Sequence, residues 1–495
     1  MESLQQAIIF FETHPNYRSQ TENMRITLDN GYDMLEKAYK SHLLKNSATV
    51  DPSYFLKHDM SPRVNDIKIM TEEDQVIKIG VWLLKQPRIP NNFLSYYSEI
   101  RGAQILKNIK NIAEAQKTLQ VASRSKLSTV RKPIQRLDKN DILTDIESCF
   151  VMCSSLLILF ELEEKLMVKA IPDTSKRAQV FRELVSRPLA YVVLQTQKVV
   201  NEKDVGIIPL LPLLHLLSQN YARFHNLATN SIGDVQFDSL MRQLQVKCSS
   251  YVNEVIENLN EDTTKYVPPD GNVHPTTAST LNFLSSLTAH RVTVTQHVLA
   301  LTAPQGSNTN LLLPKLFARI LSALGSMLKK KANIYDDPTL ATIFLLNNYN
   351  YIAKTLADEQ DGLLPAITEM NSNILSFYHE EIATCTNEYL KSWNGISSVL
   401  KSVERIGEDK QMARQIMSTF VREFDQVLAQ QTDYCISDPK MSSNVQTAVK
   451  NRIEKNYFHL LDICQRLHVF PQGIKYTENA FEMAIRNLFS SAKIN

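Results

Sequence analysis

The stretch from Tyr335 to Ile352 reads YDDPTLATIFLLNNYNYI and predicts a buried α-helix. Asp337 can cap the start of this helix, and Pro338 suits its first turn, where a missing backbone N–H breaks no hydrogen bond. Apolar residues then recur at helical spacing, namely Leu340, Ile343, Phe344 and Tyr351, with Leu345, Leu346 and Tyr349 widening the apolar arc. A helix that is apolar this far round is covered by other helices.

Asn347 falls on the same helical face as Leu340 and Phe344. A buried amide must find hydrogen-bond partners, because leaving it unpaired away from water is unfavourable. We therefore expect Asn347 to be bonded between neighbouring helices near the middle of a long helical stack.

The composition predicts an all-α protein. The chain has 495 residues, of which 43% are hydrophobic, so it can form real cores, and its length corresponds to roughly three domains. It contains only twelve glycines. Hairpins, barrels and nucleotide-binding loops all require glycine, so this scarcity favours helices joined by short polar loops.

Charge and cysteine content point to no special class. The 54 basic and 52 acidic residues nearly cancel, so any attraction to an anionic surface depends on where the charges lie. The six cysteines form no CxxC pair and are expected to be free thiols. No secretory signal is visible, and the apolar runs Cys149–Leu162 and Ile207–Leu217 are too short or too interrupted to span a bilayer, so no transmembrane segment is expected.

Helical patterning covers most of the chain. The predicted helices of the first half are Leu4–Phe11, one through Met34 to Leu43, Val76–Leu84, Phe93–Leu119, Ile142–Leu166, Thr174–Lys203, Pro209–Leu227 and Gly233–Leu259. Beside the opening helix, those of the second half are Thr276–Leu301, Leu311–Lys331, Glu369–Ser402, Lys410–Gln430, Asn444–Leu467 and Glu478–Ser491. No fixed-period repeat is evident, so serially packed bundles are favoured over a strict solenoid.

Residues 122–140 form a basic segment with little apolar periodicity. Such a segment is either a solvated linker or an anion-binding loop.

No catalytic or metal-binding motif is present. The sequence His379–Ala383 begins like a zinc-protease helix but lacks the second histidine that would supply two ligands on one face. Asp336 and Asp337 resemble half of an acidic metal motif, which the helix cap explains. There is no Walker loop, GxGxxG or GxSxG. The sequence therefore predicts a protein that is not an enzyme and needs no cofactor.

Several collinear stretches together resemble one family, exocyst complex component seven, the seventy-kilodalton subunit of the exocyst tether. The central stretch is the opening helix with the preceding Lys329–Lys331, and the second is GNVHPTTASTLNFLSSL at Gly271–Leu287. The N-terminal LQQAIIFFETHP, the Trp82–Leu83 region, YCISDP at Tyr434–Pro439 and IKYT at Ile474–Thr477 complete the resemblance in the same order.

The resemblance implies an elongated rod of consecutive helical bundles of the tethering-complex type. We expect bundles at residues 1–121, 142–270, 271–403 and 404–495, the last facing the membrane. The implied role is to help tether secretory vesicles to the plasma membrane before fusion. The implied partners are other exocyst subunits, phosphatidylinositol 4,5-bisphosphate and Rho-type small GTPases. No nucleic-acid partner is expected.

The resemblance also implies a cytoplasmic protein that lies peripherally at the inner leaflet of the plasma membrane. Family members begin with a coiled-coil-forming segment that pairs them with another exocyst subunit, whereas this chain starts at the following hairpin. Either the sequence is a fragment or this paralogue joins the complex weakly.

The C-terminal residues favour an anionic partner. From Lys440 to Asn495 there are eight basic residues against four acidic ones, a net charge of +4. In the helix from Asn444, Arg452, Lys455 and His459 lie well away from the apolar face. Such a stripe suits a helix docked on anionic lipid, although an ordinary solvated face has the same pattern.

The resemblance identifies Lys475, in IKYT, as one of the family's phosphoinositide-binding lysines. The companion lysine expected three residues earlier is Gln472 here, and Lys450, Arg452 and Lys455 could compensate for it. We therefore predict a phosphoinositide site at Lys475, Lys455, Arg452 and Lys450. The alternative is a divergent protein-binding helical scaffold without lipid affinity.

Overall fold

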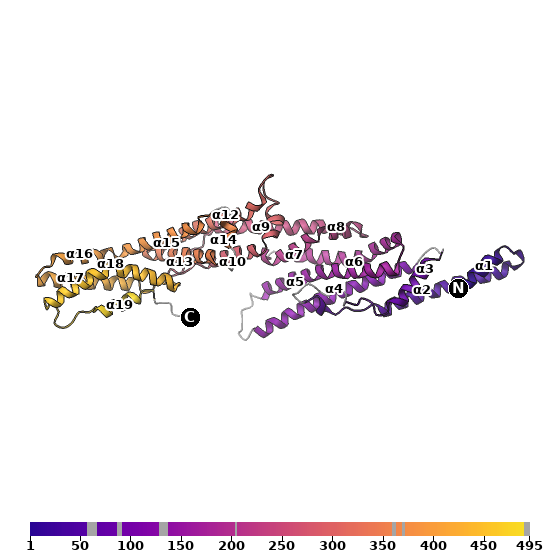
Figure 1. Ribbon diagram of the computed structural model, residues 1–495, viewed down its shortest axis with the longest axis horizontal. Helices are drawn as coiled ribbons and strands as arrows, with labels where there is room; N and C mark the ends of the chain where they lie inside the picture. Colours follow the sequence, from indigo (N-terminus) through magenta and orange to yellow (C-terminus); the bar gives the residue numbers. More distant parts are fainter. Residues whose placement is uncertain are drawn as a thin grey trace. The chain divides into compact units, whose positions relative to one another are not determined.

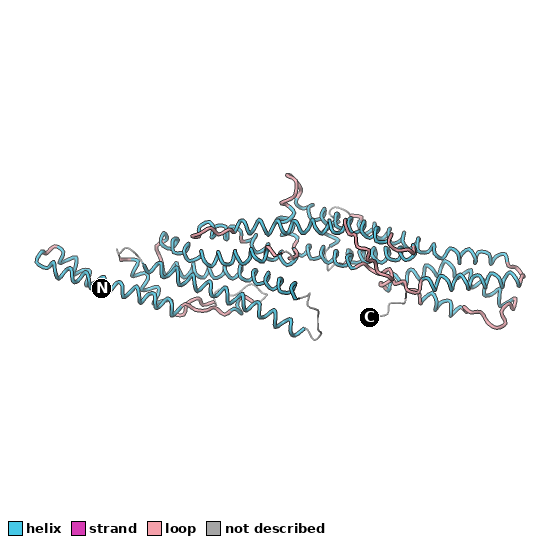
Figure 2. The backbone as a smooth tube through the Cα atoms, turned by 180° about the vertical axis from the view of Figure 1, so that it is seen from behind, coloured by secondary structure: helices cyan, strands magenta, loops and turns pink. Residues whose placement is uncertain are grey.

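The protein is described here by a computed structural model that covers residues 1–56, 67–86, 92–127, 137–202, 205–358, 363–368 and 372–489. These ranges contain helices, turns and loops but no β-strand, and one isolated bridge joins Ser47 to Met70 (Figure 2). The predicted all-α class is confirmed. The side chains of the basic segment 122–140, and the backbone of 128–136, lie outside the described residues.

The chain divides into two compact units, Met1–Ser249 and Ser250–Asn495. Each unit is built of long helices packed side by side, as expected for consecutive bundles (Figure 1). A division into two units leaves open how each is subdivided, so the boundaries of the four expected bundles stay a prediction.

The helices of the first unit are α1 (Glu2–Glu12), α2 (Arg18–Asn46), α3 (Glu73–Leu84), α4 (Asn92–Leu127), α5 (Leu137–Ala170), α6 (Thr174–Val200), α7 (Ile207–Gln219), α8 (Tyr221–Asn230) and α9 (Phe237–Asn260). The last of these continues into the second unit. Helices α4, α5 and α6 pack against one another, with α2 against α4 and α7 against α5.

The second unit continues with α10 (Pro275–Ala289), α11 (Arg291–Val294), the π-helical turn η5 (Thr295–Leu299), α12 (Leu312–Ala332), α13 (Pro338–Ala357), α14 (Leu363–Thr368), α15 (Ile374–Leu390), α16 (Asn394–Lys401), α17 (Lys410–Gln430), α18 (Pro439–Arg466) and α19 (Glu478–Arg486). Helix α13 packs against α10, α12, α14 and α15, and α16 to α19 form a second group (Figure 1).

Three predicted helices are interrupted in the structure. The segment predicted as Pro209–Leu227 breaks at Asn220, between α7 and α8. The segment predicted as Thr276–Leu301 breaks at His290 and then changes to the π-helical turn. The segment predicted as Glu369–Ser402 tightens into a 3₁₀ turn at Lys391–Trp393, between α15 and α16. There the Ser392 hydroxyl donates to the Tyr389 carbonyl at 2.8 Å, and such a local bond competes with the regular helix. Residues 369–371 of this segment lie outside the described part.

Helix α13 begins as its sequence predicts and is largely buried. The Asp337 carboxylate accepts hydrogen bonds from the backbone N–H groups of Thr339 at 2.8 Å and Leu340 at 3.4 Å. Phe344 is fully buried and its ring lies 5.5 Å from that of Tyr335. The end of the helix that Asp337 caps is therefore fixed within the core of the second unit.

Two buried asparagines of α13 bind segments that are distant in sequence. Asn347 Nδ2 donates to the carbonyl oxygens of Gly271 at 2.8 Å and Cys435 at 2.7 Å. Asn348 Oδ1 accepts from the backbone N–H of His274 at 3.0 Å and from the Thr277 hydroxyl at 2.7 Å. The expected need of Asn347 for partners is confirmed, and those partners are loop carbonyls rather than groups on neighbouring helices.

Gly271 is required where Asn347 binds it. Its φ of +75° is in the left-handed region, and an added Cβ would lie 2.9 Å from a methyl carbon of Leu340. The close approach of this loop to α13 therefore depends on the missing side chain.

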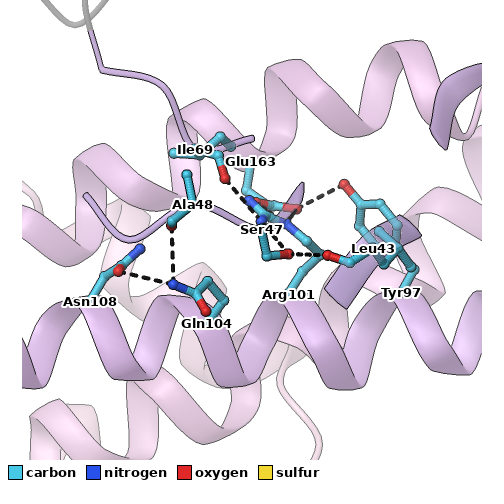
Figure 3. A network of polar contacts seen from close by, with 9 residues as sticks. All are labelled: Leu43, Ser47, Ala48, Ile69, Tyr97, Arg101, Gln104, Asn108 and Glu163. Carbon is cyan, nitrogen blue, oxygen red and sulfur yellow. Dashed lines mark hydrogen bonds and ion pairs between the residues drawn. The ribbon is translucent and has the colours of Figure 1, made fainter. Parts of the chain in front are cut away.

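The first unit contains a buried ion pair between α4 and α5. Arg101 Nη2 lies 2.6 Å from Glu163 Oε2, with the two side chains 1% and 0% exposed (Figure 3). Tyr97 donates its hydroxyl hydrogen to Glu163 at 2.8 Å. Arg101 Nη1 also donates to Ser47 Oγ at 3.0 Å and to the Ile69 carbonyl at 3.1 Å. The pair thus holds two non-helical segments against the helices.

Next to this pair, side chains of α4 form hydrogen bonds with the backbone of the segment that follows α2. Gln104 Nε2 donates to the Ala48 carbonyl at 3.0 Å (Figure 3). Asn108 Oδ1 accepts from the Val50 N–H at 3.3 Å. Burial raises the pKa of Tyr97 well above its ordinary value, and the Glu163 carboxylate raises it further. Tyr97 is therefore a neutral hydrogen-bond donor at neutral pH.

All six cysteines are free and buried, as the sequence predicts. Two helical stretches, Asp141–Ala170 and Thr309–Ala332, are long and apolar enough to cross a membrane by length and composition. The apolar run Cys149–Leu162 was expected to be too short to span a bilayer, but the whole helix that contains it is long enough. In each stretch more than half of the most apolar window is buried inside the protein, at 67% and 56%, as in the core helices of proteins that do not span membranes.

We predict that Phe344→Ala lowers the free energy of unfolding of the second unit by about 3–5 kcal/mol, because a fully buried aromatic side chain leaves a cavity. Chemical denaturation followed by circular dichroism measures this. Leu301→Ala is the control, since Leu301 is 52% exposed and its truncation should change stability by no more than about 0.5 kcal/mol. Equal effects of the two substitutions would contradict the burial of Phe344.

We predict that Glu163→Gln destabilises the first unit by about 3–5 kcal/mol, because Arg101 would remain buried without a counter-charge. The matched control is Glu161→Gln on the same helix. Its exposed pair with Lys165 should contribute only about 0.2–1 kcal/mol. Denaturation curves of the two variants should differ clearly, and coincident curves would show that the buried pair does not hold the unit together.

Candidate anion-binding surface

Helix α18 and the loop 467–477 carry the residues that the sequence predicts to bind phosphoinositide, and α17 and α19 pack nearby. Helix α18 begins at an Asp–Pro pair, where the Asp438 carboxylate accepts from the Met441 N–H at 2.8 Å. One face of α18 is buried, through Val445, Val449, Ile453, Tyr457 and Leu460. This buried face fixes which side chains of α18 point to solvent.

Arg452, Lys455 and His459 lie on an exposed face of α18, as their spacing predicts. The Arg452 guanidinium donates to the side chain of Asn394, at the start of α16. Among the described residues Lys455 has no ion pair, so its ammonium group is available to a ligand. These three residues form one continuous basic stripe.

Lys450 points to a different side of α18, toward α19. Its ammonium nitrogen lies 2.8 Å from a Glu482 carboxylate oxygen and 3.2 Å from one of Glu454. Hydrogen bonds to Glu482 and Glu454 raise the pKa of Lys450, and the same contact lowers the pKa of Glu482. Lys450 is thus already neutralised by two carboxylates.

Lys475 lies in the loop before α19 and contacts α17. Its ammonium nitrogen is 2.5 Å from Asp425 Oδ2 and 5.3 Å from the centre of the Tyr476 ring. The Tyr476 hydroxyl donates to the other oxygen of Asp425 at 2.5 Å. Burial alone would raise the pKa of Asp425, but the bonds from Lys475 and Tyr476 outweigh it and the pKa is lowered. Asp425 therefore stays ionised and paired at neutral pH.

The four predicted residues do not converge on one pocket. Arg452 and Lys455 share a face of α18, Lys450 lies on another face, and Lys475 lies on a separate loop with the exposed Gln472. Sequence reasoning missed the carboxylates that pair with Lys450 and Lys475. The pair between Lys450 and Glu454 could have been predicted, because residues four apart are neighbours on a helix. The pairs with Asp425 and Glu482 could not, because these carboxylates belong to other helices.

The described ranges contain no cluster of three or more histidine, cysteine, aspartate or glutamate residues arranged to hold a metal ion. Arg452, Lys455 and Lys475 bring guanidinium and ammonium groups to this surface, and such groups attract anions through charge and donate hydrogen bonds.

Comparison with known proteins places these observations in a family. The family model for the C-terminal part of the Exo70 subunit of the exocyst complex matches residues 148–487. Exocyst complex component 7 of Homo sapiens is 19% identical, with 92% of this chain and 79% of that protein covered. The same component of Drosophila melanogaster is 20% identical, with 96% and 80% covered.

Among solved structures, the crystal structure of the exocyst component Exo70p of S. cerevisiae is similar in fold. Its TM-score is 0.54 at 11% identity, and the similarity covers 99% of this chain and 94% of that one. The family model alone spans more than half of the chain. The resemblance found in the sequence is confirmed, and this chain belongs to the Exo70 family of exocyst subunits.

Proposed function

We propose that this chain acts as an exocyst subunit that helps to tether secretory vesicles to the plasma membrane before fusion. The observation that carries the proposal is its membership of the Exo70 family, over nearly the whole chain. In this role it is cytoplasmic, lies peripherally at the inner leaflet, and works with other exocyst subunits and Rho-type small GTPases. It provides binding surfaces rather than catalysis.

The proposed membrane contact is the basic stripe of α18 together with Lys475. A cation near an anionic membrane surface contributes about 1 kcal/mol, so a few unpaired side chains suffice for reversible attachment. Arg452 and Lys455 are exposed, and the Lys475 side chain is 57% exposed. The ligand of this surface is phosphatidylinositol 4,5-bisphosphate, whose phosphate groups can accept from several cations at once.

One observation favours the alternative, a protein-binding scaffold without lipid affinity. Lys450 and Lys475 are paired with carboxylates, and Gln472 stands where a family lysine is expected. On this alternative the ion pairs serve to hold α17, α18 and α19 together, and reversing the charges of the stripe leaves membrane binding and localisation unchanged.

We predict that the chain co-sediments with phosphatidylcholine vesicles only when they contain phosphatidylinositol 4,5-bisphosphate, and less so as salt rises. Lys455→Glu with Lys475→Glu should weaken this binding on the order of tenfold or more. The charge-matched control is Lys265→Glu with Lys315→Glu, two exposed lysines elsewhere in the second unit. Absence of binding at low salt, or equal loss in both double variants, would favour the scaffold.

We predict that Asp425→Asn strengthens binding to the same vesicles roughly fivefold, because it releases Lys475 from its carboxylate partner. The control Asp336→Asn removes the same charge at another exposed position of the second unit. Since the pKa of Asp425 is lowered, its carboxylate stays ionised between neutral and mildly acidic pH, so the advantage of Asp425→Asn over the wild type should persist across this range. Unchanged binding in Asp425→Asn would place Lys475 outside the membrane contact.

A further inference from the structure

The second unit contains a largely apolar cavity far from the basic stripe in the chain. It lies between α12, α13, α14 and α15, with a volume of about 530 Å³. Its walls include Leu321, Ile367, Ile374, Phe377 and Tyr378. Cavities of this size and lining are typical of small-molecule sites, which are mostly apolar with a few polar groups.

Tyr349 of α13 lines this cavity and carries an unused polar group. The residue is 2% exposed, and its hydroxyl is buried without a hydrogen-bond partner. A buried hydroxyl without a partner is unfavourable, and nearly all such groups in native proteins are bonded to protein, water or a ligand. The hydroxyl of a residue that lines the cavity is therefore left without a partner.

Gly325 of α12 keeps the cavity open. A Cβ added there would meet no atom within 4 Å, although the backbone is helical and accepts any side chain. Glycine weakens a helix interior relative to alanine, and here it leaves space where a larger residue would fill the wall. The cavity is thus open at Gly325, a helical position where alanine or a larger residue would make α12 more stable.

A cation lies on the same face of α12, one turn after Gly325. The Lys329 side chain lines the cavity, is 60% exposed, and its ammonium nitrogen is 3.9 Å from a Glu381 carboxylate oxygen, beyond hydrogen-bonding distance. Burial raises the pKa of Tyr349, and the negative charge of Glu381 raises it further. Tyr349 and Lys329 both line the cavity.

From this arrangement we propose that the cavity binds a single-chain aliphatic carboxylate, that is, a free fatty acid. The alkyl chain lies along the apolar walls beside Gly325. The carboxylate accepts a hydrogen bond from Tyr349 and is attracted by Lys329, which has only a loose partner in Glu381. This inference does not rest on the proposed membrane contact, because none of its residues belongs to α17, α18 or α19.

The test uses the full chain and sodium dodecanoate below its micelle concentration, with calorimetric titration as the readout. We expect one-to-one binding. Gly325→Trp should weaken it on the order of tenfold or more, because the indole occupies the space of the alkyl chain. Gly325→Ala is the matched control and should bind like the wild type. Should the tryptophan variant fail to fold, as judged by circular dichroism, Gly325→Leu replaces it.

Two further variants separate the polar contacts. Tyr349→Phe should weaken dodecanoate binding roughly fivefold while leaving the melting temperature of the ligand-free protein unchanged or higher, because the removed hydroxyl had no partner. Lys329→Gln should weaken binding of dodecanoate but not of dodecan-1-ol, which has no charge. The variant Lys455→Glu with Lys475→Glu should bind dodecanoate normally, which distinguishes this site from the membrane contact.

The proposal is overturned if the wild type takes up no stoichiometric dodecanoate, or if Gly325→Trp binds it unchanged. It is also overturned if Tyr349→Phe lowers the melting temperature without affecting binding, since ordered water would then be the partner of the hydroxyl.

Discussion

The second unit depends on the two hydrogen bonds that the Asn347 amide donates to the carbonyls of Gly271 and Cys435. Buried backbone carbonyls of non-helical segments have no ladder to bond to, so a side chain must satisfy them. Asn347 does so for the segment that leads into α10 and for the one that leads into α18. The positive φ of Gly271 and its contact with Leu340 allow only glycine at that point. One amide thus fixes the starting points of two helices relative to α13.

The first unit solves the same problem with a charge. Arg101 serves more acceptors than an amide could, because its guanidinium donates to Glu163, to Ser47 and to the Ile69 carbonyl. Apolar stripes supply most of the favourable free energy of packing, but the hydrophobic effect is non-directional. An apolar stripe that slides past its neighbour loses little burial, whereas a displaced Arg101 leaves a buried charge unpaired. In both units, polar groups therefore define the register of the helices.

What the sequence predicts well is local. Asp337 and Pro338 mark the start of α13, because the bonds of this cap join residues that are close together in the chain, and the apolar arc marks the burial of the helix. The need of Asn347 for partners also follows from its place on that arc. The identity of those partners does not, because Gly271 and Cys435 are 76 and 88 residues away in the chain. The 3₁₀ turn at Lys391–Trp393 could not be predicted either, because the spacing of apolar residues hardly changes across a single tightened turn.

The candidate surface shows the same limit for charges. The exposure of Arg452 and Lys455 follows from helical periodicity alone, whereas the pairing of Lys475 depends on Asp425, from another helix. This pairing has a consequence for selectivity in the proposed membrane contact. A lipid with one negative charge would replace Asp425 by an equivalent partner and gain little. A headgroup with several phosphates offers Lys475 more negative charge than Asp425 does, so that the new contact offsets the lost ion pair. Paired cations would in this way favour polyvalent headgroups over the bulk of anionic lipid.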